Sequence, residues 1–336
     1  MNSEVLLRVL ADGQYHSGEA LGRALCISRS AVWKQIRGLR GMGLDIQSVK
    51  GRGYRLVGGL ELLDRQRLES GSDGIPGILR GHLHLHASID STNAEAMRLL
   101  RQGESRCVVV AEHQSRGRGR RGRSWVSPFG RNIYLSLLWP FERGVAAMEG
   151  LSLVCALAVE QALADVGVSG VQLKWPNDVL HDGRKLAGIL LEVQGDFSDR
   201  CQLVIGVGVN ADMTGEAAGA IDQPYSDVKT AAGHGVDRNR LVIGLVQHLA
   251  RSLERFEEQG FTPFRERWME RDHYLGKDVE LHCGQQVLRG RLEGVDESGR
   301  LQLYEPETGN VRTVAGGEVF PSLRPAGVKR VTGHDT

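Results

Sequence analysis

The chain has 336 residues, enough for two or three domains of ordinary size. Its formal net charge is +1 and charged residues make up 25% of it, which excludes a largely disordered chain. Glycine is unusually frequent, at 44 residues, and predicts many turns or loops where the backbone comes close to a ligand.

The sequence gives no support for a membrane protein, a secreted protein or a metal-binding protein. No apolar stretch reaches the roughly 18 residues that a membrane span needs, and the first residues lack the pattern of a signal peptide. The cysteines never occur as a C-x-x-C pair, so neither a disulfide framework nor a zinc site is indicated, and a reducing cytoplasm is the expected compartment. They are Cys26, Cys107, Cys155, Cys201 and Cys283.

The N-terminal segment is strongly basic. Residues 23–55 hold eight arginines and lysines and one acid, Asp45, which gives a local charge of +7. Such a patch on an otherwise slightly acidic chain is typical of a nucleic-acid contact, although a solvated basic face is the alternative.

Local patterns in this segment favour a winged helix-turn-helix. Ser17 and Ser28 are placed to cap two short helices, and a hairpin with a basic tip follows over residues 46–56. We therefore predict a DNA-binding domain over residues 1–62, with the helix-turn-helix from Gly18 to Arg37. Trp33 is expected to pack into the core. The expected DNA contacts are Ser28, Ser30, Lys34 and Arg37 on the second helix, and Lys50, Arg52 and Arg55 on the wing.

The rest of the chain predicts a linker and two further domains. Glycine, serine and proline mark a linker over residues 63–81. Strand and helix patterns then mix over 82–272, which indicates an α/β or α+β domain, and short strands over 273–325 predict a small β-barrel. The expected strands are 83–87, 107–112, 133–139, 171–175, 186–193 and 203–209, and the expected helices are 94–101, 148–166, 238–259 and 263–271.

An arginine- and glycine-rich loop is the most unusual stretch. Residues 116–123 contain five arginines and three glycines. Its backbone amides and guanidinium groups suit an anion, and mutual repulsion predicts that the loop is mobile until one binds. The spacing of Gly117, Gly119 and Gly122 matches a dinucleotide fingerprint, but Pro128 and Gly130 follow where that motif needs a helix.

Other polar groups stand at expected ends of strands and helices. Ser91-Thr92-Asn93 either caps a helix or binds a polar ligand head, and Gln114 could add an amide. Pro176 forces a turn that displays Asn177 and Asp178. Lys185 beside an apolar run either points into a site or lies on the surface. Gly206 and Gly208 leave one face of a strand bare, where something flat could lie. The long segment 211–236 is small and polar, which is typical of a functional or disordered loop.

Together these motifs resemble biotin–protein ligases, in order and in spacing. The N-terminal domain and the terminal barrel resemble the bifunctional form that is also the biotin operon repressor, so the resemblance runs from about Leu6 to about Leu323. It implies an α+β fold with a winged helix-turn-helix, a central mixed α/β ligase domain and an SH3-like β-barrel. The motifs are Ser91-Thr92-Asn93, Gln114, the loop 117–123, Lys174-Trp175-Pro176-Asn177-Asp178, residues 184–188 and residues 206–210.

The resemblance implies a two-step reaction with ATP and Mg²⁺. Biotin and ATP would form biotinyl-5′-adenylate, and biotin would then pass to a lysine of a biotin carboxyl carrier protein, as in acetyl-CoA carboxylase. Repression would follow when an adenylate-bound homodimer binds operator DNA, with no membrane involved.

The resemblance also assigns roles to residues of this chain. Catalysis would fall to Lys185, Arg118 and Arg120, and we add Asp178 as a hypothetical proton acceptor because it stands at a strand end. Biotin would bind Ser91, Thr92, Asn93, Gln114, Arg118, Gly119, Arg120 and Lys185. The adenylate would bind Arg120, Arg121, Trp125, Asn177 and Asn210.

Two alternatives stay open. The chain could be a ligand-sensing transcription factor without catalysis, although the intact arginine loop, Asp178 and Lys185 argue against it. It could also be a lipoate or octanoyl ligase on a related fold, since the sequence does not give the shape of the pocket. His113 and Trp33 depart from the family pattern, before Gln114 and on the DNA-reading helix respectively.

Overall fold

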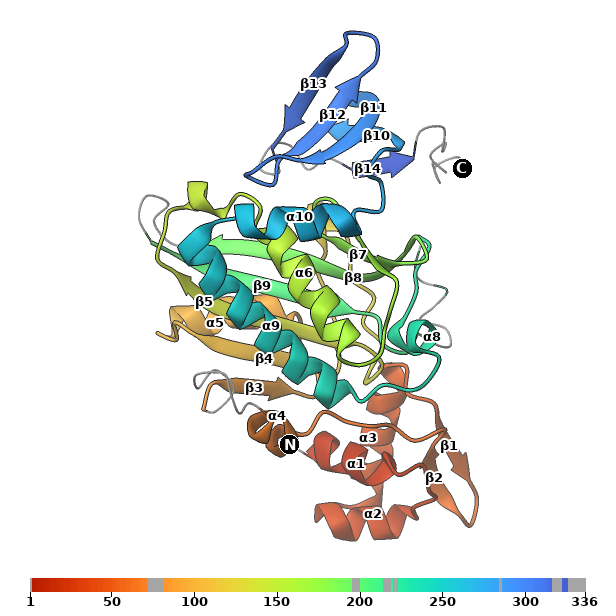
Figure 1. Ribbon diagram of the computed structural model, residues 1–336. Coiled ribbons are helices and arrows are strands. Elements are labelled where there is room, and N and C mark those ends of the chain that lie inside the picture. The colour runs from red at the N-terminus through yellow and green to blue at the C-terminus, as the bar shows by residue number, and fades with distance from the viewer. Residues whose placement is uncertain are drawn as a thin grey trace.

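The computed structural model describes residues 2–71, 81–194, 200–213, 219, 221, 223–283, 286–315 and 322–325. Along the chain these residues form a small helical unit with a hairpin, a seven-stranded sheet with helices, and a five-stranded sheet at the opposite end of the molecule (Figure 1). The predicted α+β class is confirmed.

The N-terminal unit has the predicted winged helix-turn-helix form. Its elements are α1 (Asn2–Leu10), α2 (Gly18–Leu25), α3 (Arg29–Gly41), β1 (Ile46–Val49) and β2 (Gly53–Leu56). Both predicted caps are present: the Ala20 amide donates to Ser17 Oγ at 3.0 Å, and the Ala31 amide donates to Ser28 Oγ at 3.2 Å. These bonds satisfy amides that a helix start leaves without a partner.

The prediction that Trp33 packs into the core is wrong. Its side chain is 54% exposed on α3. Val32, Ile36 and Leu39 form the buried stripe of this helix, and residue 33 lies about 100° around the helix axis from residue 32. The indole therefore shares the outward face with the polar residues.

The central sheet has the order β3-β4-β5-β9-β8-β7-β6, in which only β3 and β4 are parallel neighbours. Its seventh strand, β7, was not predicted, because it is a four-residue return strand directly after the turn at Pro176. Asp178 is thus the first residue of β7, paired with Lys174, and not a loop residue. The strands are β3 (Leu83–His86), β4 (Cys107–Ala111), β5 (Ile133–Phe141), β6 (Val171–Lys174), β7 (Asp178–His181), β8 (Arg184–Gln194) and β9 (Cys201–Val209).

Helices cover the two faces of this sheet unequally. α6 (Leu151–Ala164) and α9 (Arg238–Gln259) pack against each other on one face, and the shorter α5 (Thr92–Arg101) packs on the other (Figure 1). The second face therefore keeps an uncovered area beside the start of α5. The remaining helical elements are α4 (Arg65–Ser70), η1 (Arg120–Gly122), η2 (Val145–Met148), α8 (Val228–Ala232) and α10 (Thr262–Arg271).

One helical stretch contradicts the expectation that no apolar segment is long enough to span a membrane. Val145–Ala164, which joins η2 to α6, is long and apolar enough to cross a membrane by length and composition. However, 56% of that window is buried inside the protein, and α6 supplies much of the main hydrophobic core. A core helix passes the same test, so the observation is weak evidence for a membrane span.

The C-terminal strands form an antiparallel sheet in the order β13-β12-β11-β10-β14. An SH3-like arrangement fits this sheet, but among the described residues no pairing of β13 with β14 closes it into a barrel. The strands are β10 (Asp278–Cys283), β11 (Gln286–Val295), β12 (Leu301–Glu305), β13 (Asn310–Val314) and β14 (Ser322–Pro325).

A buried ion pair of the central domain holds the segment that follows the helix-turn-helix unit. Glu112 Oε2 accepts from Arg238 Nη2 at 2.5 Å, and both side chains are at most 7% exposed. Glu112 Oε1 also accepts from the Leu63 amide, and Arg238 Nη1 donates to the carbonyls of Glu61 and Gly130. The segment that was expected to be a loose linker is therefore held by charged hydrogen bonds at its start, and residues 72–80 lie outside the described chain.

Candidate active site

A cavity of about 660 Å³ opens on the face of the sheet that α5 leaves uncovered. Such a volume suits a small organic ligand. Its described lining carries six cationic side chains against one acid, Asp178, which favours a ligand of high negative charge. The cations are Arg118, Arg120, Arg121, Arg123, Lys174 and Lys185.

One end of the cavity is a buried polar cluster at the start of α5. The Thr92 amide and hydroxyl donate to Gln114 Oε1 at 2.9 and 3.2 Å. The Ser136 hydroxyl lies 2.7 Å from Thr92 Oγ1 and 2.5 Å from Asn93 Oδ1. Ser91, Thr92 and Asn93 are each no more than 4% exposed. This cluster offers donors and acceptors at fixed positions.

Capping does not explain the Ser91 side chain. Ser91 is the N-cap residue of α5, but its hydroxyl makes no capping hydrogen bond; it accepts instead from Arg118 Nε at 3.4 Å. Of the two interpretations of Ser91-Thr92-Asn93, the capping one therefore loses its main support. Ser136 belongs to the same cluster and was missed, because its place in an apolar strand gave no signal.

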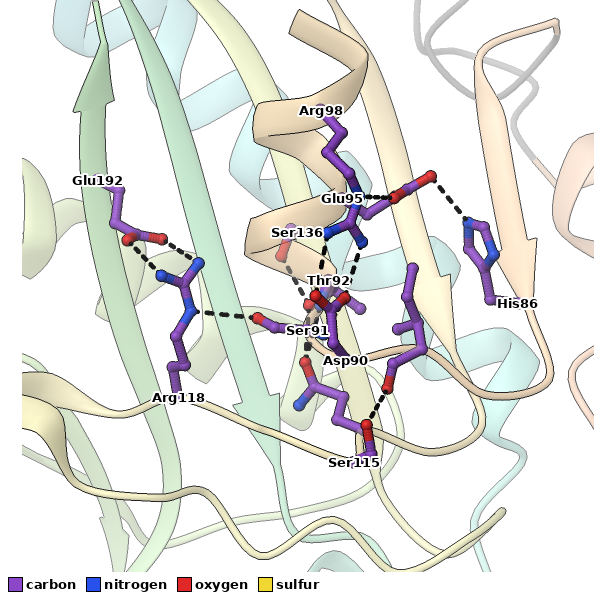
Figure 2. A network of polar contacts seen from close by, with 12 residues as sticks. His86, Asp90, Ser91, Thr92, Glu95, Arg98, Ser115, Arg118, Ser136 and Glu192 are labelled. Carbon is purple, nitrogen blue, oxygen red and sulfur yellow. Dashed lines mark hydrogen bonds and ion pairs between the residues drawn. The ribbon is translucent and has the colours of Figure 1, made fainter. Parts of the chain in front are cut away.

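Arg98 and Asp90 hold the loop before α5 in place. The Arg98 guanidinium donates to both oxygens of Asp90, at 2.7 and 3.0 Å, and to Glu95 at 2.6 Å (Figure 2). Arg98 lowers the pKa of Asp90 to about 2, so this carboxylate stays charged at neutral pH and also accepts from the Ser91 amide. These two residues position the cluster without lining the cavity.

Arg118 reaches across the cavity to β8. Its Nη1 and Nη2 each donate to a Glu192 oxygen at 3.1 Å (Figure 2). Glu192 also accepts from Asn93 Nδ2 at 2.7 Å, so one carboxylate joins the arginine loop to the α5 cluster. Sequence reasoning missed Glu192, although an acid inside an apolar strand pattern is a usable signal.

The second half of the arginine loop faces the Trp-Pro-Asn-Asp turn. Arg120 Nη1 donates to Asn177 Oδ1 at 2.6 Å, and Asn177 Nδ2 donates to the Ile189 carbonyl. Burial lowers the pKa of Arg120, while the nearby Asp178 carboxylate acts in the opposite direction. Arg121 takes a left-handed backbone conformation with φ 58°, so the loop turns sharply at this residue.

Lys185 and Asp178 form an ion pair at the cavity wall. Their Nζ and Oδ1 atoms are 2.7 Å apart, and each side chain is 19% exposed. Lys185 is also held through its backbone, because its amide donates to the Pro224 carbonyl and its carbonyl accepts from the Ser226 amide. Lys185 therefore lines the site and is not a surface lysine.

Two opposed glycines make a flat floor under Trp125. Gly188 and Gly208 are register partners on β8 and β9. A Cβ on Gly208 would meet the indole at 2.6 Å, and one on Gly188 would meet it at 3.2 Å. The flat group expected over this strand is therefore the Trp125 side chain. Lys185 Nζ lies 5.6 Å from the ring centroid, so the indole and the cation share one wall.

Two residues singled out from sequence lie outside the lining. Asn210 is buried, and its amide donates to the carbonyls of Lys185 and Ser226, which places it behind the cavity wall. His113 stacks on Phe129 with 6.2 Å between centroids, and burial lowers its pKa. Its departure from the family pattern therefore does not alter the described cavity surface.

A group of possible metal ligands lies at β3 and β4, outside the cavity. Ligand atoms of His84, Glu104 and Cys107 are all within 4.8 Å of one another. Burial raises the pKa of the Cys107 thiol to about 12, which opposes the thiolate form that binds metals.

The predicted DNA-contacting residues divide into two groups. Ser28, Ser30, Lys34, Arg37, Lys50 and Arg52 are exposed on α3 and the wing. Arg55 is half-buried and donates to Gln47 Oε1. The guanidinium carbons of Arg52 and Arg55 lie 4.1 and 4.8 Å from the Tyr15 ring centroid. The Tyr15 ring thus contacts both arginines of the wing.

Comparison with known proteins defines the class of the molecule. Residues 85–210 match the Biotin/lipoate A/B protein ligase family, residues 3–55 match an HTH domain, and residues 274–320 match the Biotin protein ligase C terminal domain. The mixed sheet with its cationic cavity is thus a protein ligase domain. The helix-turn-helix unit that precedes it in the chain is a DNA-binding domain.

Individual relatives narrow this class to one family. The chain is 40% identical to the bifunctional ligase/repressor BirA of Salmonella typhimurium, over 96% of this chain and 97% of that protein. It is 37% identical to the biotin–[acetyl-CoA-carboxylase] ligase of Paracoccus denitrificans, over 70% of this chain and 96% of that protein. The structure of Aquifex aeolicus biotin protein ligase in complex with biotin and ATP aligns with a TM-score of 0.62 at 28% identity, over 73% of this chain and all of that one. The chain belongs to the bifunctional biotin–protein ligase and repressor family.

Proposed function

We propose that the chain activates biotin with ATP, transfers it to a carrier-protein lysine, and represses transcription when the adenylate is bound. The observation that carries this proposal is the cavity itself, in which six cations surround one acid beside a buried polar cluster. A molecule with an uncharged hydrogen-bonding head and an anionic tail fits both ends.

The polar cluster is assigned to the head of biotin. A ureido ring offers two N–H donors and one carbonyl acceptor, which Thr92, Asn93 and Gln114 can complement. The dithiolane ring of lipoate has no such groups, so it would form no hydrogen bond with this cluster. This argument favours biotin over lipoate within the matched family.

The cationic end is assigned to the phosphates. The biotin carboxylate attacks the α-phosphorus of ATP, a new O–P bond forms, and the bond to pyrophosphate breaks. Two anions must approach each other, so catalysis consists mainly of positioning and charge neutralisation by Arg118, Arg120 and Lys185. Trp125, Asn177 and Arg121 line the region assigned to the nucleotide, and Asn210 supports that region from behind.

Asp178 is proposed to accept the proton of the carrier lysine in the second step. Its contact with Lys185 Nζ holds the carboxylate at the cavity wall. The lysine amine then attacks the acyl carbon, and AMP leaves. We expect Asp178→Asn to form adenylate but transfer biotin slowly, whereas transfer at the normal rate would contradict this role.

Mg²⁺ is proposed to enter with ATP. Asp178 is the one carboxylate among the described lining residues and supplies the hard oxygen that Mg²⁺ prefers. The ion would neutralise phosphate charge that the arginines do not reach. Few protein ligands are expected, because Mg²⁺ keeps water and phosphate oxygens in its coordination sphere.

Dimerisation and operator binding are proposed to follow adenylate formation. β7 pairs with β8 only as far as Gly188, and Asn177 binds both backbone groups of Ile189. The outer edge of β8 beyond Ile189 therefore offers backbone groups for a second copy. The arginine loop, which contacts Glu192 on this same strand, would couple ligand binding to this edge. Equal sedimentation of the chain with and without adenylate would contradict the coupling.

The proposed setting is the cytoplasm, where the carrier protein and operator DNA are both accessible, and no membrane partner is proposed. Incubation with labelled biotin, ATP and the carrier domain of acetyl-CoA carboxylase tests the enzyme. We expect label on the carrier, with release of AMP and pyrophosphate. Faster labelling with lipoate would favour the alternative ligase, and binding of biotin without adenylate formation would indicate a non-catalytic sensor.

A further inference from the structure

Trp33 is a large apolar side chain in an unusual place. It is 54% exposed, whereas Trp139, Trp175 and Trp268 are at most 1% exposed. Nothing in the packing of the helix-turn-helix unit requires an indole on this outer surface, since Val32, Ile36 and Leu39 fill the inner side of α3. An exposed aromatic on a charged surface often marks a site of contact.

The neighbours of Trp33 form one continuous face. Ser30, Lys34 and Arg37 lie three or four residues from it or from one another along α3, and all are exposed; residues at these spacings share a face of a helix. The guanidinium carbon of Arg37 is 5.8 Å from the centroid of the Trp33 ring. This contact orients the indole and keeps a cation beside it.

A glycine continues this face. Gly38 follows Lys34 by four residues, and a Cβ at this position would meet nothing within 4 Å. Internal packing therefore does not demand glycine here, and glycine is unfavourable within a helix. A missing side chain lets a helix backbone come closer to whatever lies outside it. This face of α3 is thus basic, has an aromatic side chain at its centre, and lacks a side chain at Gly38.

We propose that Trp33 reads the C5 methyl group of a thymine in the major groove, with Arg37 placed at the neighbouring base or phosphate. This proposal rests on the proposed repressor function. DNA is favoured as the occupant because the face carries Lys34 and Arg37 and no acid. In the major groove the thymine methyl is an apolar feature that distinguishes this base.

The test begins with selection of binding sites. The full chain and its Trp33→Ala variant each select duplexes from a random library, with biotin and ATP present. We expect the wild-type chain to enrich a thymine in each half-site that the variant does not enrich. Val311→Ala is the matched control, because Val311 is 52% exposed in the C-terminal sheet and should leave the selected sequence unchanged.

The second stage isolates the methyl group. In the selected duplex, each thymine is replaced in turn by deoxyuridine, which lacks only that methyl. At one position per half-site, we expect wild-type affinity to fall by about fivefold or more, within the usual range for one altered base pair. Affinity of Trp33→Ala should change less than twofold. The slope of affinity against salt should be equal for both proteins, because no charge is removed.

The possible outcomes distinguish failure of the role of Trp33 from failure of the proposed repressor function. If the wild-type chain selects a sequence and Trp33→Ala selects the same one with equal affinity, the role of Trp33 is overturned and the repressor function stands. If Trp33→Ala weakens dimerisation without DNA, Trp33 is a protein contact and the role is also overturned. If the wild-type chain selects no sequence, the repressor function fails and the role fails with it. The unfolding midpoint of Trp33→Ala shows that the variant is folded.

Discussion

The glycine floor beneath Trp125 gives a sharp test of the cavity. In Gly208→Ala, the new Cβ would stand 2.6 Å from Cε2 and 2.7 Å from Cζ2 of the Trp125 ring, whereas ordinary contact begins near 3.4 Å. The indole must therefore retreat by about 0.8 Å, that is 3.4 minus 2.6. Overpacking of this kind costs roughly 1–3 kcal/mol, and a misplacement near 1 Å can cost up to about 100-fold in rate.

The assay is ATP–pyrophosphate exchange in the presence of biotin, which measures formation of the adenylate. We expect kcat/KM of Gly208→Ala to fall by roughly tenfold or more. Gly235→Ala is the matched control, since a Cβ at Gly235 meets nothing within 4 Å, and it should retain wild-type kinetics. Exchange by Gly208→Ala within twofold of wild type would refute the placement of the nucleotide beside Trp125.

Three further predictions concern the loop, the domain junction and pH. Arg118→Gly removes the two bonds to Glu192 and should release free adenylate faster in a filter-binding assay; unchanged release would count against retention by the loop. Glu112→Gln leaves Arg238 buried without its carboxylate and should lower the free energy of unfolding by about 3–5 kcal/mol in a urea titration, whereas a loss below about 1 kcal/mol would show that the pair is dispensable. Burial raises the pKa of Asp272 from 3.8 to about 7, so the unfolded chain ionises first and stability falls between about pH 4 and pH 7, then levels off. Asp272→Asn should remove this fall, and equal pH dependence of urea unfolding in both proteins would contradict it.

The long periodic elements could be predicted from the sequence. α9 runs over Arg238–Gln259 as expected, because its apolar spacing extends over many turns and Asp237 caps its start. β7 was missed because it returns directly after the turn at Pro176, and α4 because six residues are too few to show a helical period. α4 is also polar, so it resembled part of a linker.

The partners within the site could not be predicted. Ser136 and Glu192 belong to the polar cluster, yet they follow Asn93 by 43 and 99 residues and stand in apolar strands. Only the pairing of β5, β8 and β9 brings them beneath the start of α5. The prediction for Trp33 failed for another reason. The apolar character of tryptophan favoured the core, whereas the helical period places residue 33 on the outer face of α3.

A crystal structure with a hydrolysis-resistant analogue of biotinyl-5′-adenylate would reveal how the cavity is used. The ureido ring is predicted to lie against Thr92 and Gln114, the phosphate among Arg118, Arg120 and Lys185, and the adenine beside Trp125. The analogue bound elsewhere on the protein, with this cationic cavity empty, would contradict the proposed reaction.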